Sequence, residues 1–217
     1  MPAIPYKNFT LFYLVIATAY FVSLTWLPQY VAVTKPLIVS GLIGFYISAE
    51  PRQNHVFLLG LIFALLGDIF LMFDGSLFFT IGLAAFLLMQ WCYVYMFSLH
   101  FQKPDPATTL KIILLTGMSG VLLYILWPGL GDMIWPVMLY IFSILTMVSL
   151  SITRKKSMKG YQNVVLGALF FMVSDTLLAI DKFTVPVPVA SYLIMASYMA
   201  AQYFIVTGVV TGNAVKK

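Results

Sequence analysis

The sequence predicts an all-α, polytopic membrane protein built as a bundle of eight transmembrane helices. Of its 217 residues, 62% are hydrophobic and only 9% are charged, whereas a soluble globular domain carries about 25% charged residues. The apolar residues form eight runs, each close to the roughly 20 residues that a membrane-spanning helix needs. These runs occupy nearly the whole chain, so we predict a single membrane domain over residues 1–217.

The individual helices follow from these runs and from the residues between them. The first run is too long for the core of a signal peptide and no A-x-A cleavage site follows it, so we interpret it as a transmembrane helix. Proline or glycine marks most of the joints, at Pro28, Pro51, Pro104, Pro106, Pro128, Gly129, Pro186 and Pro188. In chain order, the helices are expected at about 9–27, 32–49, 55–73, 76–98, 109–127, 132–152, 161–180 and 187–210.

Basic residues predict the orientation in the membrane. With eight helices, both termini and the loops after the second, fourth and sixth helices share one side. The other side holds only Lys35 and Lys182 of the 12 basic residues. Because cytoplasmic loops are rich in Lys and Arg, we expect both termini in the cytoplasm and an integral multi-pass protein of a bacterial cytoplasmic membrane. The basic residues of the predicted cytoplasmic side are Lys7, Arg52, Lys103, Lys111, Arg154, Lys155, Lys156, Lys159, Lys216 and Lys217.

Two apolar segments around Asp68 and Asp175 align with each other. Five positions of the first recur in the second at a constant offset of 107 residues. We interpret the chain as a duplicated unit with halves at about 1–103 and 104–217. Four helices in each half predict a parallel 4+4 repeat about an axis along the membrane normal. The matching positions are Gly60, Phe63, Asp68, Leu71 and Asp74, which correspond to Gly167, Phe170, Asp175, Leu178 and Asp181.

The two aspartates at the centre of this alignment are the candidate catalytic residues. A carboxylate in a transmembrane segment costs about 2.5–3.5 kcal/mol on insertion scales and usually marks a functional site. Two acids in a pocket of low dielectric share a proton, so one can donate it while the other activates water. The alternative is a buried structural pair that holds the bundle together. Both acids are expected roughly 8 Å below the outer boundary of the membrane.

Other polar residues are candidates for substrate binding. Lys35 begins the second helix on the same side, where it either snorkels to the interface or contacts the acids or a phosphate. Gln90, Gln202 and Tyr140 lie deep in their helices, where such residues either link helices or line a pocket. Ser174 is next to Asp175, although no neighbouring base marks it as a nucleophile. We expect no metal or cofactor, because the apolar segments contain no His or Cys cluster and no nucleotide fingerprint.

This set of residues resembles the YhhN-like family of multi-helix membrane proteins, known as lysoplasmalogenases. The resemblance implies hydrolysis of the vinyl ether bond of lysoplasmalogens to a fatty aldehyde and glycerophosphoethanolamine or glycerophosphocholine. It also implies a lysophospholipid from the bilayer and water as the reactants. We expect no nucleic acid as a partner, because the basic residues are spread over short loops, as flanks of membrane helices are. One departure is Gln90, where the family more often has His. The resemblance rests on Lys35-Pro36-Leu37, Gly67-Asp68, Leu71, Phe78, Gly82, Phe86, Pro136, Tyr140, Gly167-Ala168, Phe171, Ser174-Asp175, Leu178-Ala179, Phe183, Tyr198 and Ala201-Gln202.

Three alternative functions are compatible with the same acids. A proton-coupled transporter of lipids or small molecules also uses repeated halves and paired intramembrane acids. An intramembrane aspartyl protease is disfavoured, because Leu65 occupies the first glycine position of the expected G-x-G-D motif. A structural or lipid-sensing protein would use the acids only as a polar contact between helices.

Overall fold

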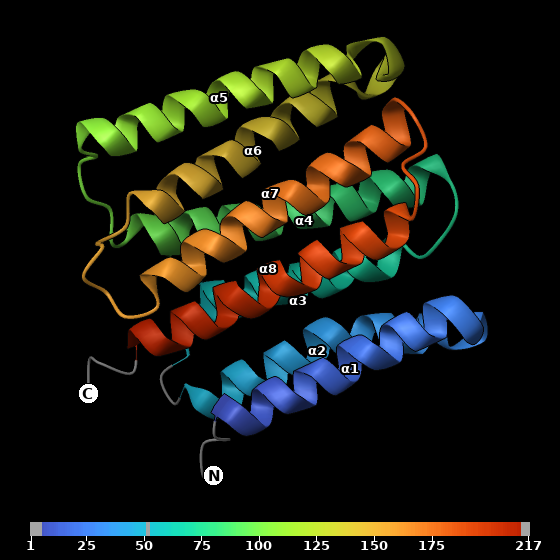
Figure 1. Ribbon diagram of the computed structural model, residues 1–217, viewed down its shortest axis with the longest axis horizontal. Coiled ribbons are helices and arrows are strands. Elements are labelled where there is room, and N and C mark those ends of the chain that lie inside the picture. The colour runs from blue at the N-terminus through green and yellow to red at the C-terminus, as the bar shows by residue number, and fades with distance from the viewer. Residues whose placement is uncertain (1–5, 51–52, 214–217) are drawn as a thin grey trace. The chain divides into compact units, whose positions relative to one another are not determined.

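The computed structural model describes residues 6–50 and 53–213 (Figure 1). Within these residues the chain forms eight α-helices and no β-strand, which confirms the predicted all-α class and the number of helices. Short 3₁₀ turns occupy Pro28–Tyr30, Trp127–Gly129 and Gly131–Met133. The helices are α1 (Tyr6–Trp26), α2 (Val31–Ala49), α3 (His55–Phe70), α4 (Ser76–Ser98), α5 (Pro106–Leu126), α6 (Ile134–Ile152), α7 (Tyr161–Phe183) and α8 (Ala190–Asn213).

Seven helices in the described part of the chain are long and apolar enough to cross a bilayer, as expected of an integral multi-pass membrane protein. The exception is α3, which has 16 residues. At 1.5 Å per residue it is about 24 Å long, whereas the hydrocarbon core of a bilayer is about 30 Å thick. The sequence predicted this helix to continue to residue 73, but α3 ends at Phe70, and Gly75 follows with a φ of 116°. A spanning role for α3 therefore stays a prediction.

The chain divides into two compact units, of which the first extends to Tyr93 and contains α1, α2, α3 and most of α4. In this unit α1 packs on α2, and α2 packs on α3. The ring of Phe9 on α1 stacks on that of Phe45 on α2, with 3.8 Å between the ring centres. The core consists of buried apolar side chains of α2 and α3, including Ile38, Val39, Leu42, Tyr46, Phe57 and Leu61.

Glycines bring α3 and α4 together within the first unit. A Cβ atom at Gly67 would lie 2.8 Å from the ring of Phe86, and one at Gly82 would lie 2.9 Å from the side chain of Leu71. Small residues at such contacts let membrane helices approach closely. The two contacts also give the register, because residue 67 meets residue 86 while residue 71 meets residue 82. α3 and α4 are therefore antiparallel neighbours.

The second unit, Val94–Gly212, contains the end of α4 and the helices from α5 to α8. α6 packs between α5 and α7 (Figure 1). Leu126, Leu130 and Val137 form a buried cluster near the turn that joins α5 to α6. α7 and α8 meet at Gly167, where a Cβ atom would lie 2.7 Å from the carbonyl oxygen of Ala201. This contact brings the segment of α7 before Asp175 close to the backbone of α8.

Several predictions about the whole chain stay predictions. They are the parallel repeat, its halves at about 1–103 and 104–217, the single membrane domain, and the cytoplasmic location of both termini. Three of the basic residues behind the predicted orientation, Arg52, Lys216 and Lys217, lie outside the described residues.

Candidate active site

In the first unit, the candidate site centres on Asp68. This residue precedes the end of α3 by two positions, and its side chain is 2% exposed. Lys35, near the start of α2, interacts electrostatically with Asp68. Two of the predicted site residues therefore lie in the same unit, and a role for Lys35 as a counter-charge stays a prediction.

Gln90 lies in the same unit, on the face of α4 that meets α3. It follows Phe86 by four residues, so its side chain is about one turn, or 6 Å, further along the helix. Since Phe86 contacts Gly67, Gln90 lies about one turn away from the level of Asp68. Gln90 is fully buried, and neither its Nε2 nor its Oε1 atom has a hydrogen-bond partner among the residues that the structure describes. A buried amide of this kind is unfavourable unless a water molecule or a ligand pairs with it.

In the second unit, the candidate site centres on Asp175. The Tyr140 hydroxyl of α6 donates a hydrogen bond to Oδ2 of Asp175 on α7, with 2.5 Å between the oxygens. This distance is within the range of about 2.5–2.7 Å for a hydroxyl that donates to a carboxylate. Tyr140 is 7% exposed and Asp175 is half-buried, so little water competes for this hydrogen bond. Tyr140 therefore fixes the orientation of the Asp175 carboxylate.

Ser174 and Gln202 are both buried in the second unit. The Ser174 hydroxyl donates to the carbonyl oxygen of Ile194 on α8 at 3.0 Å, and the side chain is 1% exposed. Ser174 thus links α7 to α8. Gln202 is fully buried in α8. Further along α7, the carboxylate of Asp181 accepts a hydrogen bond from the backbone N–H of Val187 at 2.8 Å, as expected for a residue that closes the loop to α8.

Sequence reasoning did not predict the contact between Tyr140 and Asp175, although a signal was present. Tyr140 follows the start of α6 by six residues, and Asp175 precedes the end of α7 by eight. At 1.5 Å per residue these depths are about 9 and 12 Å. Because antiparallel neighbours place the start of one helix beside the end of the next, the two residues lie at similar depth. Comparing depths across adjacent helices would have identified the pair.

The two units supply different chemical groups. The first contains a buried carboxylate with a nearby ammonium group and an unpaired amide. The second contains a carboxylate held by a phenol. Carboxylates can donate protons or activate water as general acids and bases. Over the ranges that the structure describes, no three His, Cys, Asp or Glu side chains are grouped as metal ligands would be.

Comparison with known proteins relates the chain to one family. The sequence model of the YhhN family matches residues 30–209. Lysoplasmalogenase TMEM86A from Bos taurus is 32% identical over 181 residues, covering 78% of this chain and 70% of the relative. Lysoplasmalogenase TMEM86B from Homo sapiens is 33% identical over 188 residues, covering 83% of this chain and 77% of the relative. No solved structure matches the chain.

The family match confirms the resemblance that the sequence indicated. It extends from the turn before α2 into α8 and includes all the candidate site residues in both units. It also covers well over half of the chain. This protein therefore belongs to the YhhN family.

Proposed function

We propose that this protein is a lysoplasmalogenase that takes lysoplasmalogen from the bilayer and hydrolyses its vinyl ether bond. The products are a fatty aldehyde and glycerophosphoethanolamine or glycerophosphocholine. The observation that carries the proposal is the similarity to lysoplasmalogenases of Bos taurus and Homo sapiens, at 32% and 33% identity. The YhhN family match over residues 30–209 includes Asp68 and Asp175.

The proposed mechanism uses the two aspartates as acid and base. The protonated acid delivers its proton to the β-carbon of the vinyl ether, which leaves an oxocarbenium ion on the carbon bound to oxygen. The carboxylate removes a proton from water as the water oxygen bonds to this carbon, forming a hemiacetal. The hemiacetal hydroxyl then loses its proton as the bond to the glycerol oxygen breaks, and this oxygen takes up a proton, which gives the aldehyde and a free glycerol hydroxyl. One water is consumed, and the proton taken from it replaces the one delivered.

The surroundings of each acid support such a mechanism. Lys35 provides a positive charge near Asp68 and is proposed to contact the phosphate of the lysolipid as well. Tyr140 orients Asp175 through the hydrogen bond at 2.5 Å. The unpaired amide of Gln90 is proposed to bind the attacking water or a glycerol hydroxyl. Gln202 is proposed to contact the substrate, and Ser174 supports Asp175 by holding α8 against α7.

The test is the release of aldehyde from lysoplasmalogen by purified protein in detergent. Asp68→Asn and Asp175→Asn each remove one acid while keeping the shape of the side chain. Each is expected to lower kcat by about 10²–10⁴-fold, the usual contribution of general acid–base catalysis. Asp132→Asn is the matched control, because Asp132 is exposed in the turn before α6.

Near-normal turnover by both acid variants would refute the proposed pairing. If the wild-type protein released no aldehyde but the same two substitutions abolished movement of a lipid or small molecule across vesicles, the protein would be a proton-coupled transporter. Transport alone cannot release aldehyde from lysoplasmalogen, so the two functions give different products.

A further inference from the structure

The amide of Gln90 is a buried polar group without a partner among the described residues. Its side chain is fully buried in α4, and neither Nε2 nor Oε1 is hydrogen-bonded. Buried polar groups in folded proteins are nearly always paired, either with the protein or with water. An amide has two N–H donors and one acceptor oxygen, and water can both accept from and donate to these groups. The Gln90 amide therefore marks a candidate water site.

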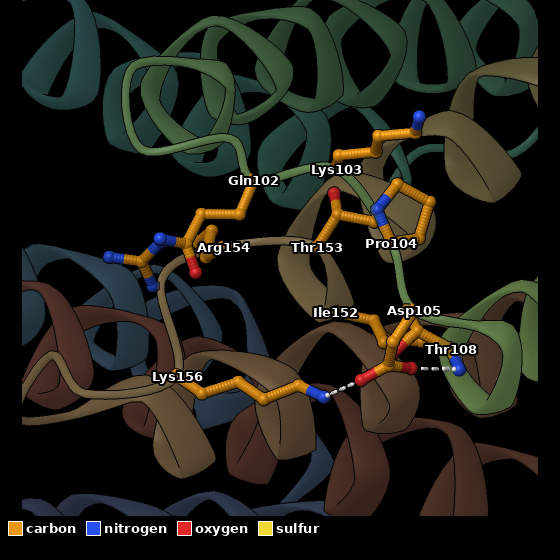
Figure 2. Close-up of a pocket in the computed structure, with 9 residues that line it drawn as sticks. All are labelled: Gln102, Lys103, Pro104, Asp105, Thr108, Ile152, Thr153, Arg154 and Lys156. Carbon is orange, nitrogen blue, oxygen red and sulfur yellow. Dashed lines mark hydrogen bonds and ion pairs between the residues drawn. The ribbon is translucent and has the colours of Figure 1, made fainter.

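The polar pocket between the loops after α4 and α6 differs in this respect (Figure 2). Lys156 there pairs with Asp105, with 2.7 Å between Nζ and Oδ2, and the other oxygen of Asp105 accepts from the backbone N–H of Thr108. The side chains of Lys103 and Arg154 point away from the pocket. Its charged side chains are therefore either paired or turned away.

The depth of Gln90 relative to Asp68 follows from the contact between α3 and α4. Because Gly67 meets Phe86 and the helices are antiparallel, the Cα atoms of Asp68 and Gln90 differ in level by five residues, or about 7.5 Å. Side chains on a helix lean toward its N-terminus. On antiparallel helices, Asp68 therefore leans toward the level of Gln90, and Gln90 leans toward the level of Asp68. The carboxylate and the amide thus end at similar depth.

The two side chains also turn to the same flank of this contact. At about 100° per residue, Asp68 points about 100° around α3 from Gly67. Gln90 points about 40° around α4 from Phe86. Both rotations follow the chain direction, so on antiparallel helices they have opposite senses in space, which turns two facing helices toward one flank. On this flank the buried Ala64, one turn before Asp68, adds only a methyl group, so no bulky side chain of α3 separates the carboxylate from the amide.

The two groups suit a water molecule that is about to react. With Lys35 as its proposed counter-charge, Asp68 is a carboxylate, which accepts hydrogen bonds and can take a proton. Oε1 of Gln90 is a second acceptor. A water that donates one O–H to each of them keeps a lone pair for attack on carbon.

We propose that Gln90 and Asp68 together hold the water that is consumed in vinyl ether hydrolysis, with Asp68 as the base. The inference rests on the proposed lysoplasmalogenase function and leaves Asp175 as the proton donor of that mechanism. The water lone pair forms the bond to the oxocarbenium carbon, the C=O π electrons return to the ether oxygen, and one water proton passes to Asp68. A second water molecule or a substrate oxygen pairs with the Nε2–H groups of Gln90.

The test measures which nucleophile captures the oxocarbenium ion. Purified full-length protein in detergent is given lysoplasmalogen in buffer that contains methanol, and the aldehyde and the mixed methyl acetal are quantified by mass spectrometry. Water can donate to both Gln90 and Asp68, whereas methanol has a single O–H and can donate to only one of them. The ratio of acetal to aldehyde reports the step that uses water, even where proton transfer limits kcat.

Gln90→Met is the test variant, because methionine has a similar size but removes the amide. Replacing an unpaired buried amide by an apolar side chain of similar shape should not lower stability, and Tm in detergent checks this. Gln162→Met is the matched control, since Gln162 is exposed near the start of α7.

The ratio of acetal to aldehyde should rise about 2- to 10-fold in Gln90→Met, the usual contribution of one hydrogen bond, and stay at the wild-type value in Gln162→Met. An unchanged ratio in Gln90→Met overturns the water site, while aldehyde release by the wild type still supports the proposed function. Loss of both products at a normal Tm also overturns it, because methanol can still donate to Asp68. No aldehyde from the wild type refutes the proposed function and the inference with it.

Discussion

Substitution of Tyr140 by Phe tests the link between the observed geometry and the proposed chemistry. The change removes only the hydroxyl that donates to Asp175 at 2.5 Å. The ring stays, so the packing of this 7% exposed side chain between α6 and α7 is retained. A hydrogen bond to a charged group contributes about 1.5–3 kcal/mol. Because each 1.36 kcal/mol is a tenfold change in rate, kcat should fall by about 10- to 150-fold.

The assay is steady-state aldehyde release from lysoplasmalogen by purified Tyr140→Phe protein, with kcat and KM determined separately. We expect the loss in kcat, because the hydroxyl positions a reacting group rather than the substrate. Tyr124→Phe makes the same chemical change at a side chain that is 82% exposed, and it should behave like the wild type. A kcat within twofold of wild type, or a loss confined to KM, would refute the positioning role.

Three further predictions concern stability. Gly67→Ala places a methyl group 2.8 Å from a phenylalanine ring of α4 and should destabilise the protein by about 1–3 kcal/mol, whereas Gly44→Ala, which faces open space, should not; equal Tm values in detergent would contradict this. Ser174→Ala loses the hydrogen bond to α8 and should lower the stability of the protein by about 1 kcal/mol with little change in turnover. Unchanged stability with a loss of turnover would show instead that Ser174 contacts substrate. The hydrogen bond from Lys156 holds the pKa of Asp105 below its usual value, so this pair stabilises the fold above about pH 4 and loses its effect at lower pH. The difference in Tm between wild type and Asp105→Asn should therefore shrink on acidification. A difference in Tm that stays constant down to about pH 3 would contradict this.

Hydropathy was sufficient to predict the eight helices, because each apolar run is long compared with the turns between them. The end of α3 was harder to predict from hydropathy. Residues 71–73 are as apolar as the helix before them, and the chain leaves the helix there because it must turn before α4. Composition does not distinguish an apolar turn from another helical turn, so the predicted end was three residues too far.

The candidate site was predicted as a set of residues but not as a set of contacts. The cost of burying a charge made Asp68 and Asp175 stand out from sequence alone. The partner of Asp175 depends on how α6 and α7 are rotated against each other, which one sequence does not specify. The same holds for Ser174, whose bond to Ile194 depends on the approach of α8. Arg154 was counted only as one of several basic loop residues, because its burial depends on two loops distant in sequence that backbone hydrogen bonds join.

The most direct test of the proposed mechanism is the mass of the aldehyde released in D₂O. Protonation of the β-carbon places one solvent deuterium on the carbon next to the aldehyde group. Wild type and Asp132→Asn should release aldehyde with one deuterium at this carbon, while Asp68→Asn and Asp175→Asn should release almost no aldehyde. Aldehyde without this deuterium, or wild-type rates from either acid variant, would contradict the assignment of vinyl ether hydrolysis to these two acids.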